Sequence, residues 1–303
     1  MELIVPTLDV TFGNMLHIPL DPRPDSDRKL QLLRDWFGKP LSLHMSVAAR
    51  LPTRLLEING PRIRLVRSSD LLKSTPAAML PYVALSHRWG TKQHRTLTAK
   101  NIRKYLNGFD IASFPQTFQD AVFVTRHLGM QYLWIDALYI LQNSKDDWKV
   151  ESLKMGDVYQ GAEVVLAAHC AGDDSEGFLQ ASLAPSYPVK FCTVPTVFAS
   201  VRSNYDADVT NSQLSRRGWV VQERFLASRT IHFADNHIYW DEPPKKLSEE
   251  GMVLHISETT STKEGTRVRT FGPSTAKQLR SLLFHEQISE ESGSATTQGT
   301  TLE

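Results

Sequence analysis

The sequence predicts an α/β protein with a mainly parallel, open sheet flanked by helices and an appended β-containing C-terminal portion. Between residues 81 and 168, short apolar runs typical of buried strands alternate with longer amphipathic segments typical of helices. This alternation favours parallel pairing, because a parallel strand pair requires a long crossover connection. Residues 188–201 and 230–240 are β-rich without clear intervening helices, which predicts the appended portion.

The expected strands follow from local patterns. RLPTRLLEI (50–58) and RIRLV (62–66) predict two strands, since the turn signal Asn59-Gly60-Pro61 separates them. PYVALS (81–86), QYLWID (131–136) and EVVLAA (163–168) predict three more strands, which we expect to share one sheet. We expect Trp134 and Trp219 to be buried, because apolar residues flank both.

The expected helices carry start and stop signals. A short helix is expected near residues 30–37, after a proline-containing loop. Residues 114–129 predict a second helix, with Pro115 in its first turn and Gly129 at its C-terminal end. Residues 144–162 predict a third, with Ser144 as N-cap. The Ser-, Thr- and Gly-rich end of the chain is expected to be disordered.

Composition excludes several classes of protein. The 303 residues carry a formal net charge of +1, which argues against electrostatic nucleic-acid binding. No run reaches the roughly 18 apolar residues of a membrane span, and the N-terminus is a poor signal peptide. With only Cys170 and Cys192, no disulfide framework is expected. We therefore expect a cytoplasmic protein.

The common cofactor and metal signatures are also missing from the sequence. There is no Walker A sequence and no GxGxxG. His87 and His94 lack a supporting cluster with metal-ligand spacing, so no metal site is expected. The adjacent His169 and Cys170 do not indicate a cysteine-protease site, since nucleophile and base normally meet through the fold.

Polar residues follow two of the expected strands. Ser86, His87, Arg88 and Trp89 come at the end of one strand, and Asp136 ends another. Ligands of open α/β sheets bind outside the carboxyl ends of the strands, which makes these residues candidate binding groups. The alternative is that Ser86 and Asp136 only cap the segments that follow them.

Glu151 places a carboxylate on the apolar face of the expected helix at 144–162. It shares a face with Trp148 and Met155, and a carboxylate on an apolar face must find a partner or take up a proton. Such groups are enriched in active sites, but a structural ion pair with an arginine gives the same pattern. The segment 214–230 holds Arg216, Arg217 and Glu223 and is best interpreted as a solvated amphipathic helix.

Three stretches together resemble one family. YVALSHRWG (82–90), the segment 128–168 and RRGWVVQERFLASRTIHF (216–233) resemble, in order, the motifs of the fungal heterokaryon incompatibility (HET) domain. The resemblance runs from about residue 51 to residue 240 and implies a HET domain over 51–242. An irregular or helical segment over 1–50 would precede it, and a variable tail over 243–303 would follow.

The resemblance implies a role in fungal non-self recognition and programmed cell death. HET domains are similar in strand and helix order to TIR domains, several of which hydrolyse NAD, so a TIR/flavodoxin-like fold is expected. In those TIR domains a glutamate in a Trp-x-x-Glu pattern acts on the ribose, and Trp148 to Glu151 resembles that pattern. Glu151 is then the expected catalytic residue. NAD would be the substrate rather than a cofactor, contacted by Ser86, Arg88, Trp89 and Asp136.

A non-enzymatic reading remains open beside the enzymatic one. Family members usually have cysteines where this chain has Tyr139 and Glu242, which excludes a thiol mechanism at either place. These departures favour a signalling or scaffold module that binds an incompatibility partner protein or a second copy of itself.

Overall fold

The computed structural model describes residues 26–38, 51–60, 62–77, 80–90, 96–179, 187–189, 197–199, 203–235, 237–243 and 245–249. Most of the C-terminal tail expected over 243–303, and the side chain of Trp219, lie outside this part of the chain; residues 245–248 of that tail form a strand. Within it, no helix is long and apolar enough to cross a membrane.

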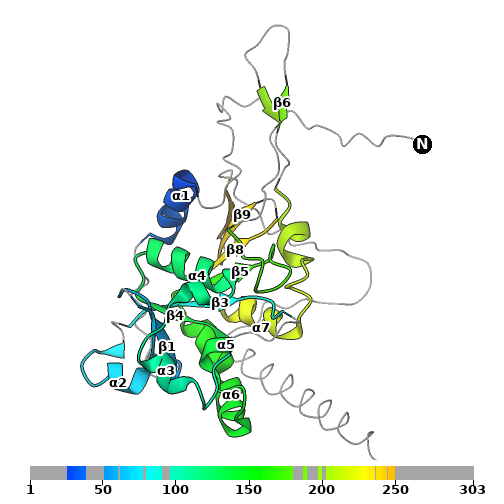
Figure 1. Cartoon of the computed structure of the whole chain (residues 1–303). Helices are drawn as coiled ribbons and strands as arrows, with labels where there is room; N and C mark the ends of the chain where they lie inside the picture. The colour runs from blue at the N-terminus through cyan, green and yellow to red at the C-terminus, as the bar shows by residue number, and fades with distance from the viewer. Residues whose placement is uncertain are drawn as a thin grey trace, which may run out of the picture. The chain divides into compact units, whose positions relative to one another are not determined.

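One eight-stranded sheet organises the described residues (Figure 1). In spatial order its strands are β10 (Lys245–Ser248), β9 (Ile238–Glu242), β8 (Thr230–Phe233), β5 (Val164–Ala168), β3 (Tyr82–Ser86), β4 (Tyr132–Trp134), β1 (Arg54–Glu57) and β2 (Arg64–Arg67). A separate antiparallel pair consists of β6 (Tyr187–Val189) and β7 (Val197–Ala199). The prediction that β3, β4 and β5 share one sheet in parallel is confirmed.

The prediction of a mainly parallel sheet is correct only for the centre. The pairs β3–β4, β3–β5 and β5–β8 are parallel, whereas β1–β2, β1–β4, β8–β9 and β9–β10 are antiparallel. Connection length explains most of this pattern: short turns join β1 to β2, β8 to β9 and β9 to β10, while helices connect the central strands. The β1–β4 pair has no short connection and forms only when the first hairpin joins the sheet edge. The expected appended portion is also corrected, because β8, β9 and β10 continue the main sheet.

The helices confirm the three expected segments. The described helices are α1 (Asp27–Phe37), α2 (Ser68–Leu71), α3 (Ile102–Leu106), α4 (Gln116–His127), α5 (Asp136–Tyr139), α6 (Lys145–Gly161) and α7 (Gly218–Leu226), with a 3-10 turn at Ile111–Ser113 and a π-helical turn at Asp206–Thr210. Ser144 caps α6 as predicted, since its Oγ accepts a hydrogen bond from the Asp147 amide at 3.2 Å. Gly129 follows α4 with φ of 74°, a conformation that glycine adopts readily.

Side chains of β3 alternate between two buried faces. Val83 and Leu85 belong to a core that includes residues of α1 and α4. Tyr82 and Ala84 belong to a second core with Trp134 and residues of α6. The helix α7 packs beside α6. Helices therefore cover both faces, and the carboxyl ends of β3, β4 and β5 lie at one edge of the sheet.

Candidate functional site

The carboxyl end of β3 meets helix α7. Ser86, the last residue of β3, is buried, and its hydroxyl group donates a hydrogen bond to Oε2 of Glu223. Glu223 lies in the second turn of α7 and is also buried. The crossover from β5 to β8 contains α7, so the parallel topology brings together two residues that are 137 positions apart in sequence.

Asp136 lies at the carboxyl end of the neighbouring strand β4, where it begins α5. Its Oδ2 accepts a hydrogen bond from the indole Nε1 of Trp89 at 2.7 Å, and its Oδ1 accepts one from the Ala137 amide at 2.7 Å. Nδ1 of His87 is 3.8 Å from Oδ1 of Asp136. The N-cap of α5 is Ile135, so Asp136 is the first helical residue rather than the cap, and its indole contact joins the two strand ends.

Two arginines complete this group. Arg88 donates to the side-chain oxygen of Gln213, and Arg217 donates to the carbonyl oxygen of His87. Trp89 is 39% exposed, so part of this residue is accessible to solvent. We call this group the strand-end cluster; its members are Ser86, His87, Arg88, Trp89, Asp136, Gln213, Arg217 and Glu223.

Burial dominates the electrostatics of the strand-end cluster. The pKa of Glu223 is raised to about 7, first by burial and then by the nearby Asp136 carboxylate, against the opposing effects of the Ser86 hydrogen bond and Arg217. Tyr159 of α6 is fully buried beside them and donates to the Leu85 carbonyl oxygen at 3.3 Å. Its pKa is raised well above the usual value, first by burial and then by Glu223 and Asp136. Near neutral pH, the Glu223 carboxyl group can therefore both donate and accept a proton.

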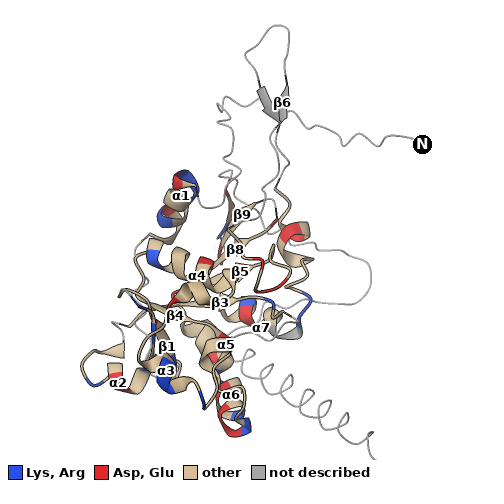
Figure 2. Cartoon of the chain, viewed as in Figure 1, with Lys and Arg blue, Asp and Glu red and all other residues tan. Residues whose placement is uncertain are grey.

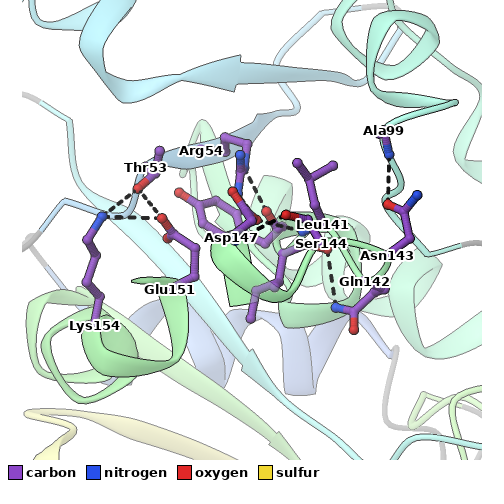
Figure 3. A network of polar contacts seen from close by, with 12 residues as sticks. Thr53, Arg54, Ala99, Leu141, Gln142, Asn143, Ser144, Asp147, Glu151 and Lys154 are labelled. Atoms are coloured by element: carbon purple, nitrogen blue, oxygen red, sulfur yellow. Dashed lines mark hydrogen bonds and ion pairs between the residues drawn. The ribbon is translucent and has the colours of Figure 1, made fainter. Parts of the chain in front are cut away.

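Glu151 occupies a different polar network (Figure 3). It is 5% exposed and accepts hydrogen bonds from Thr53 at 2.6 Å and from Lys154 at 3.3 Å. In the same view, Arg54 pairs with Asp147 at 2.6 Å. Glu151 is thus paired with the hydroxyl of Thr53, just before β1, and with the ammonium of Lys154 in α6, rather than with an arginine. Trp148, expected on the same buried face, is 44% exposed.

Aromatic rings pack near both glutamates. The ring centroid of Trp134 lies 5.5 Å from that of Tyr139 and 5.4 Å from that of Tyr159. Burial is the main cause that raises the pKa of Tyr139, and the charge of Glu151 is the second. For Tyr159, burial is again the main cause and the charge of Glu223 is the second. Among the expected site residues, the structure therefore brings Trp89 and Asp136 into direct contact and joins Ser86 and Arg88 to α7 and to the segment before it. The described contacts of Glu151 belong to the Thr53 network.

Sequence reasoning missed Glu223 as a site residue. Val220 of α7 is buried, and Glu223 follows it at a spacing of three residues. This is the same signal that singled out Glu151. It was overlooked because the surrounding Arg216, Arg217 and Arg224 predicted a solvated helix.

The described residues show neither a metal site nor a reactive thiol. No group of three or more His, Cys, Asp or Glu residues in this part of the chain is arranged to hold a metal ion. Cys170 is free, and burial raises the pKa of its thiol to about 12, so it is protonated at neutral pH. Both basic and acidic residues occur along α1 and along α6 (Figure 2).

Comparison with known proteins assigns the family. Residues 82–223 match the family model described as heterokaryon incompatibility protein (HET). The chain contains a HET domain. The match begins at the first residue of β3 and ends at Glu223, so it includes both partners of the Ser86–Glu223 contact. No curated protein and no solved structure matches the chain.

Proposed function

We propose that this HET domain acts in fungal non-self recognition and programmed cell death, and that it hydrolyses NAD at the strand-end cluster. One observation supports this site above others. A buried glutamate held by a serine lies at the carboxyl ends of parallel strands, beside a partly exposed tryptophan and two arginines.

The chemistry requires a carboxylate near the ribose. Cleavage breaks the bond between nicotinamide and C1′ of the ribose, and nicotinamide leaves with the bonding electron pair. The transition state resembles an oxocarbenium ion, which a nearby carboxylate stabilises. Water then forms a bond to C1′ and releases a proton, so the products are ADP-ribose, nicotinamide and one proton. Glu223 is the proposed carboxylate.

The other members of the cluster suit binding. The planar guanidinium of Arg88 can bind a diphosphate through two hydrogen bonds, which it would exchange for its contact with Gln213. Trp89 can stack on a ring of the substrate, since its indole is anchored at one edge by Asp136. Asp136 keeps the indole in place through the hydrogen bond to Nε1.

Glu151 is the second candidate carboxylate, supported by the resemblance of Trp148 to Glu151 to the TIR pattern. In this arrangement Glu151 would act on the ribose, and Lys154 would leave it to bind phosphate. The geometry favours Glu223, because Glu223 rather than Glu151 contacts the strand ends.

A non-enzymatic signalling or scaffold module is the alternative function. The observation that favours it is that the polar groups of the strand-end cluster bond to one another, as structural networks do. In that case a partner protein or a second copy of the chain would bind to the surface of the domain, and the strand-end cluster would only stabilise the fold.

Incubation of the purified chain with NAD tests the proposal. We expect free nicotinamide and ADP-ribose in equal amounts, separated by chromatography, and growth arrest when the chain is expressed in a fungus. Growth arrest without NAD cleavage would support the scaffold reading and contradict the enzymatic one.

A further inference from the structure

A second buried polar network, which we call the histidine network, lies one strand away from the strand-end cluster and is centred on His169 and His232. His169 follows β5 directly, and His232 lies in the neighbouring strand β8. Nε2 of His169 is 2.9 Å from Nδ1 of His232, and the residues are 6% and 0% exposed. Two imidazoles in hydrogen-bond contact can share only one proton between the facing nitrogens, so at most one of the two facing atoms carries hydrogen.

The outer partners of the two histidines determine the direction of the hydrogen bonds in the histidine network. Nδ1 of His169 lies 2.7 Å from the Ser212 hydroxyl, and Nε2 of His232 lies 3.3 Å from the Tyr205 hydroxyl. Tyr205 donates to Oδ2 of Asp241 at 2.7 Å. With both rings neutral, every group is satisfied if Ser212 donates to His169, His169 to His232, and His232 to Tyr205.

Three charged groups face the pair. Arg224 of α7 donates to the Tyr205 hydroxyl at 3.3 Å. Lys246 of β10 and Asp241 of β9 form an ion pair at 3.5 Å, and Oδ2 of Asp241 is 3.8 Å from Nε2 of His232. Burial lowers the pKa of His169 well below its usual value, and His232 and Arg224 lower it further. Burial also lowers the pKa of His232, which Asp241 opposes.

The segment 205–217 connects the histidine network to the strand-end cluster. It contains Tyr205, the π-helical turn at Asp206–Thr210 and Ser212, and π-helical turns occur frequently at functional sites. The next residue, Gln213, accepts the hydrogen bond of Arg88. At the end of the segment, Arg217 donates to the His87 carbonyl oxygen. The hydrogen bond between His169 and Ser212 is thus one of the contacts that hold a segment carrying two groups of the candidate site; buried Val209 and Leu214 also anchor it.

We propose that His169, oriented by His232, is a positioning residue that latches segment 205–217, and that protonation of His169 releases the segment and displaces Arg88 and Arg217. A protonated His169 would have to donate its Nδ1 hydrogen to the Ser212 hydroxyl, which would reverse this hydrogen bond, and its positive charge would lie buried near Arg224. When the segment opens, His169 reaches water and binds a proton at an ordinary pH. Acid therefore favours the open segment, because the open state binds more protons than the closed state below about pH 6.5.

Hydrogen exchange of the segment as a function of pH tests the latch. Amide exchange of peptides within 205–217 is measured from pH 8 to about pH 5 and corrected for the intrinsic pH dependence of exchange. We expect the corrected rate in wild type to rise about tenfold per pH unit below about pH 6.5, as one proton is taken up on opening. Peptides of β3 and β5 should stay protected over the same range.

Two variants separate His169 from other histidines. His169→Gln cannot titrate and should lose the acid dependence, with faster exchange of the segment already at pH 8. His127→Gln is the matched control, because burial also lowers the pKa of His127, yet that side chain lies on α4 beside Arg34. It should behave as wild type.

A pH-independent rate in wild type, or an acid dependence that persists in a folded His169→Gln, would overturn the proposal. The wild-type series decides the matter even if the variant does not fold. If the proposed NAD hydrolysis also holds, KM for NAD should rise over the same pH range with little change in kcat. The exchange experiment does not depend on activity, so failure of the latch and failure of the enzymatic proposal give different results.

Discussion

Burial in the fold disfavours the ionised form of the Glu223 carboxyl group. Its pKa in the folded chain is about 7, against an ordinary 4.5, so the folded state binds an additional proton between these values. Stability is therefore highest at low pH with respect to this group and declines as pH rises towards 7. For a fully buried group, the shift corresponds to a cost on the order of 3 kcal/mol above pH 7.

Glu223→Gln should remove that cost. We expect the variant to be more stable than wild type at pH 8 by up to about 3 kcal/mol, and the difference to vanish near pH 4. The free energy of unfolding from urea titrations at both pH values checks this. Glu151→Gln is the control, since it removes a carboxylate that Thr53 and Lys154 stabilise and should not raise stability. Equal stability of Glu223→Gln and wild type at pH 8 would show that Glu223 is not held in an unfavourable environment.

Arg88→Ala tests the binding role at the same scale. Arg88 is only half-buried and bonds to an exposed glutamine, so the substitution should change the free energy of unfolding by less than about 1 kcal/mol. If its guanidinium meets a diphosphate, KM for NAD should rise about tenfold or more while kcat changes little. Arg103→Ala is the control, because it removes an exposed arginine of α3, which packs against the edge strand β2 of the sheet, and it should leave both values unchanged. An unchanged KM in Arg88→Ala would remove this residue from the site.

Single residues of the site were only partly predictable from sequence. Ser86, Arg88, Trp89 and Asp136 could be proposed because polar side chains at strand ends are a local signal. Their partner could not be chosen locally, because Glu223 and Glu151 satisfy the same helical spacing. The distinction depends on which helix crosses the carboxyl end of β3, and that is a property of the topology.

At the scale of elements, Trp134 is the central residue of the face that α6 covers. It is 1% exposed and packs between the rings of Tyr139 and Tyr159, as expected from its apolar flanks. Trp134→Ala should lower the free energy of unfolding by about 3 to 5 kcal/mol, because the cavity cannot close against rigid strands. Phe123→Ala, at an exposed position of α4, should cost far less. Chemical denaturation of the two variants measures the difference, and equal stability would mean that Trp134 does not lie in the core.

Elements were easier to predict than their pairing. The helices α4 and α6 and the strands β3 and β5 each carry a complete local pattern of apolar spacing, cap and turn residues. The pairing of β1 with β4 has no such signal, since Leu56 and Leu133 meet only after the sheet assembles. The turn signal at Asn59-Gly60-Pro61 does separate β1 from β2, but nothing local predicts that this hairpin joins the sheet beside β4.

At the scale of the molecule, a buried ion pair joins the two ends of the described chain. Nζ of Lys29 in α1 is 2.8 Å from Oε2 of Glu249, which follows β10, and both side chains are at least 96% buried. Lys29→Met leaves Glu249 buried without this cation and should cost about 3 to 5 kcal/mol. Adding Glu249→Met should recover much of the loss, so the double variant should be more stable than the sum of the single variants predicts. Additive losses, measured by urea denaturation, would show that the pair does not couple the ends.

The most direct measurement compares the two candidate carboxylates in one assay. Nicotinamide release from NAD is followed for wild type, Glu223→Gln and Glu151→Gln, after circular dichroism shows that all three are folded. The strand-end account predicts that Glu223→Gln loses at least about a hundredfold in kcat, as expected for loss of a charge that stabilises the transition state, while Glu151→Gln stays within a few-fold of wild type. The opposite pattern would place the chemistry at Glu151, and full activity of a folded Glu223→Gln would contradict the account.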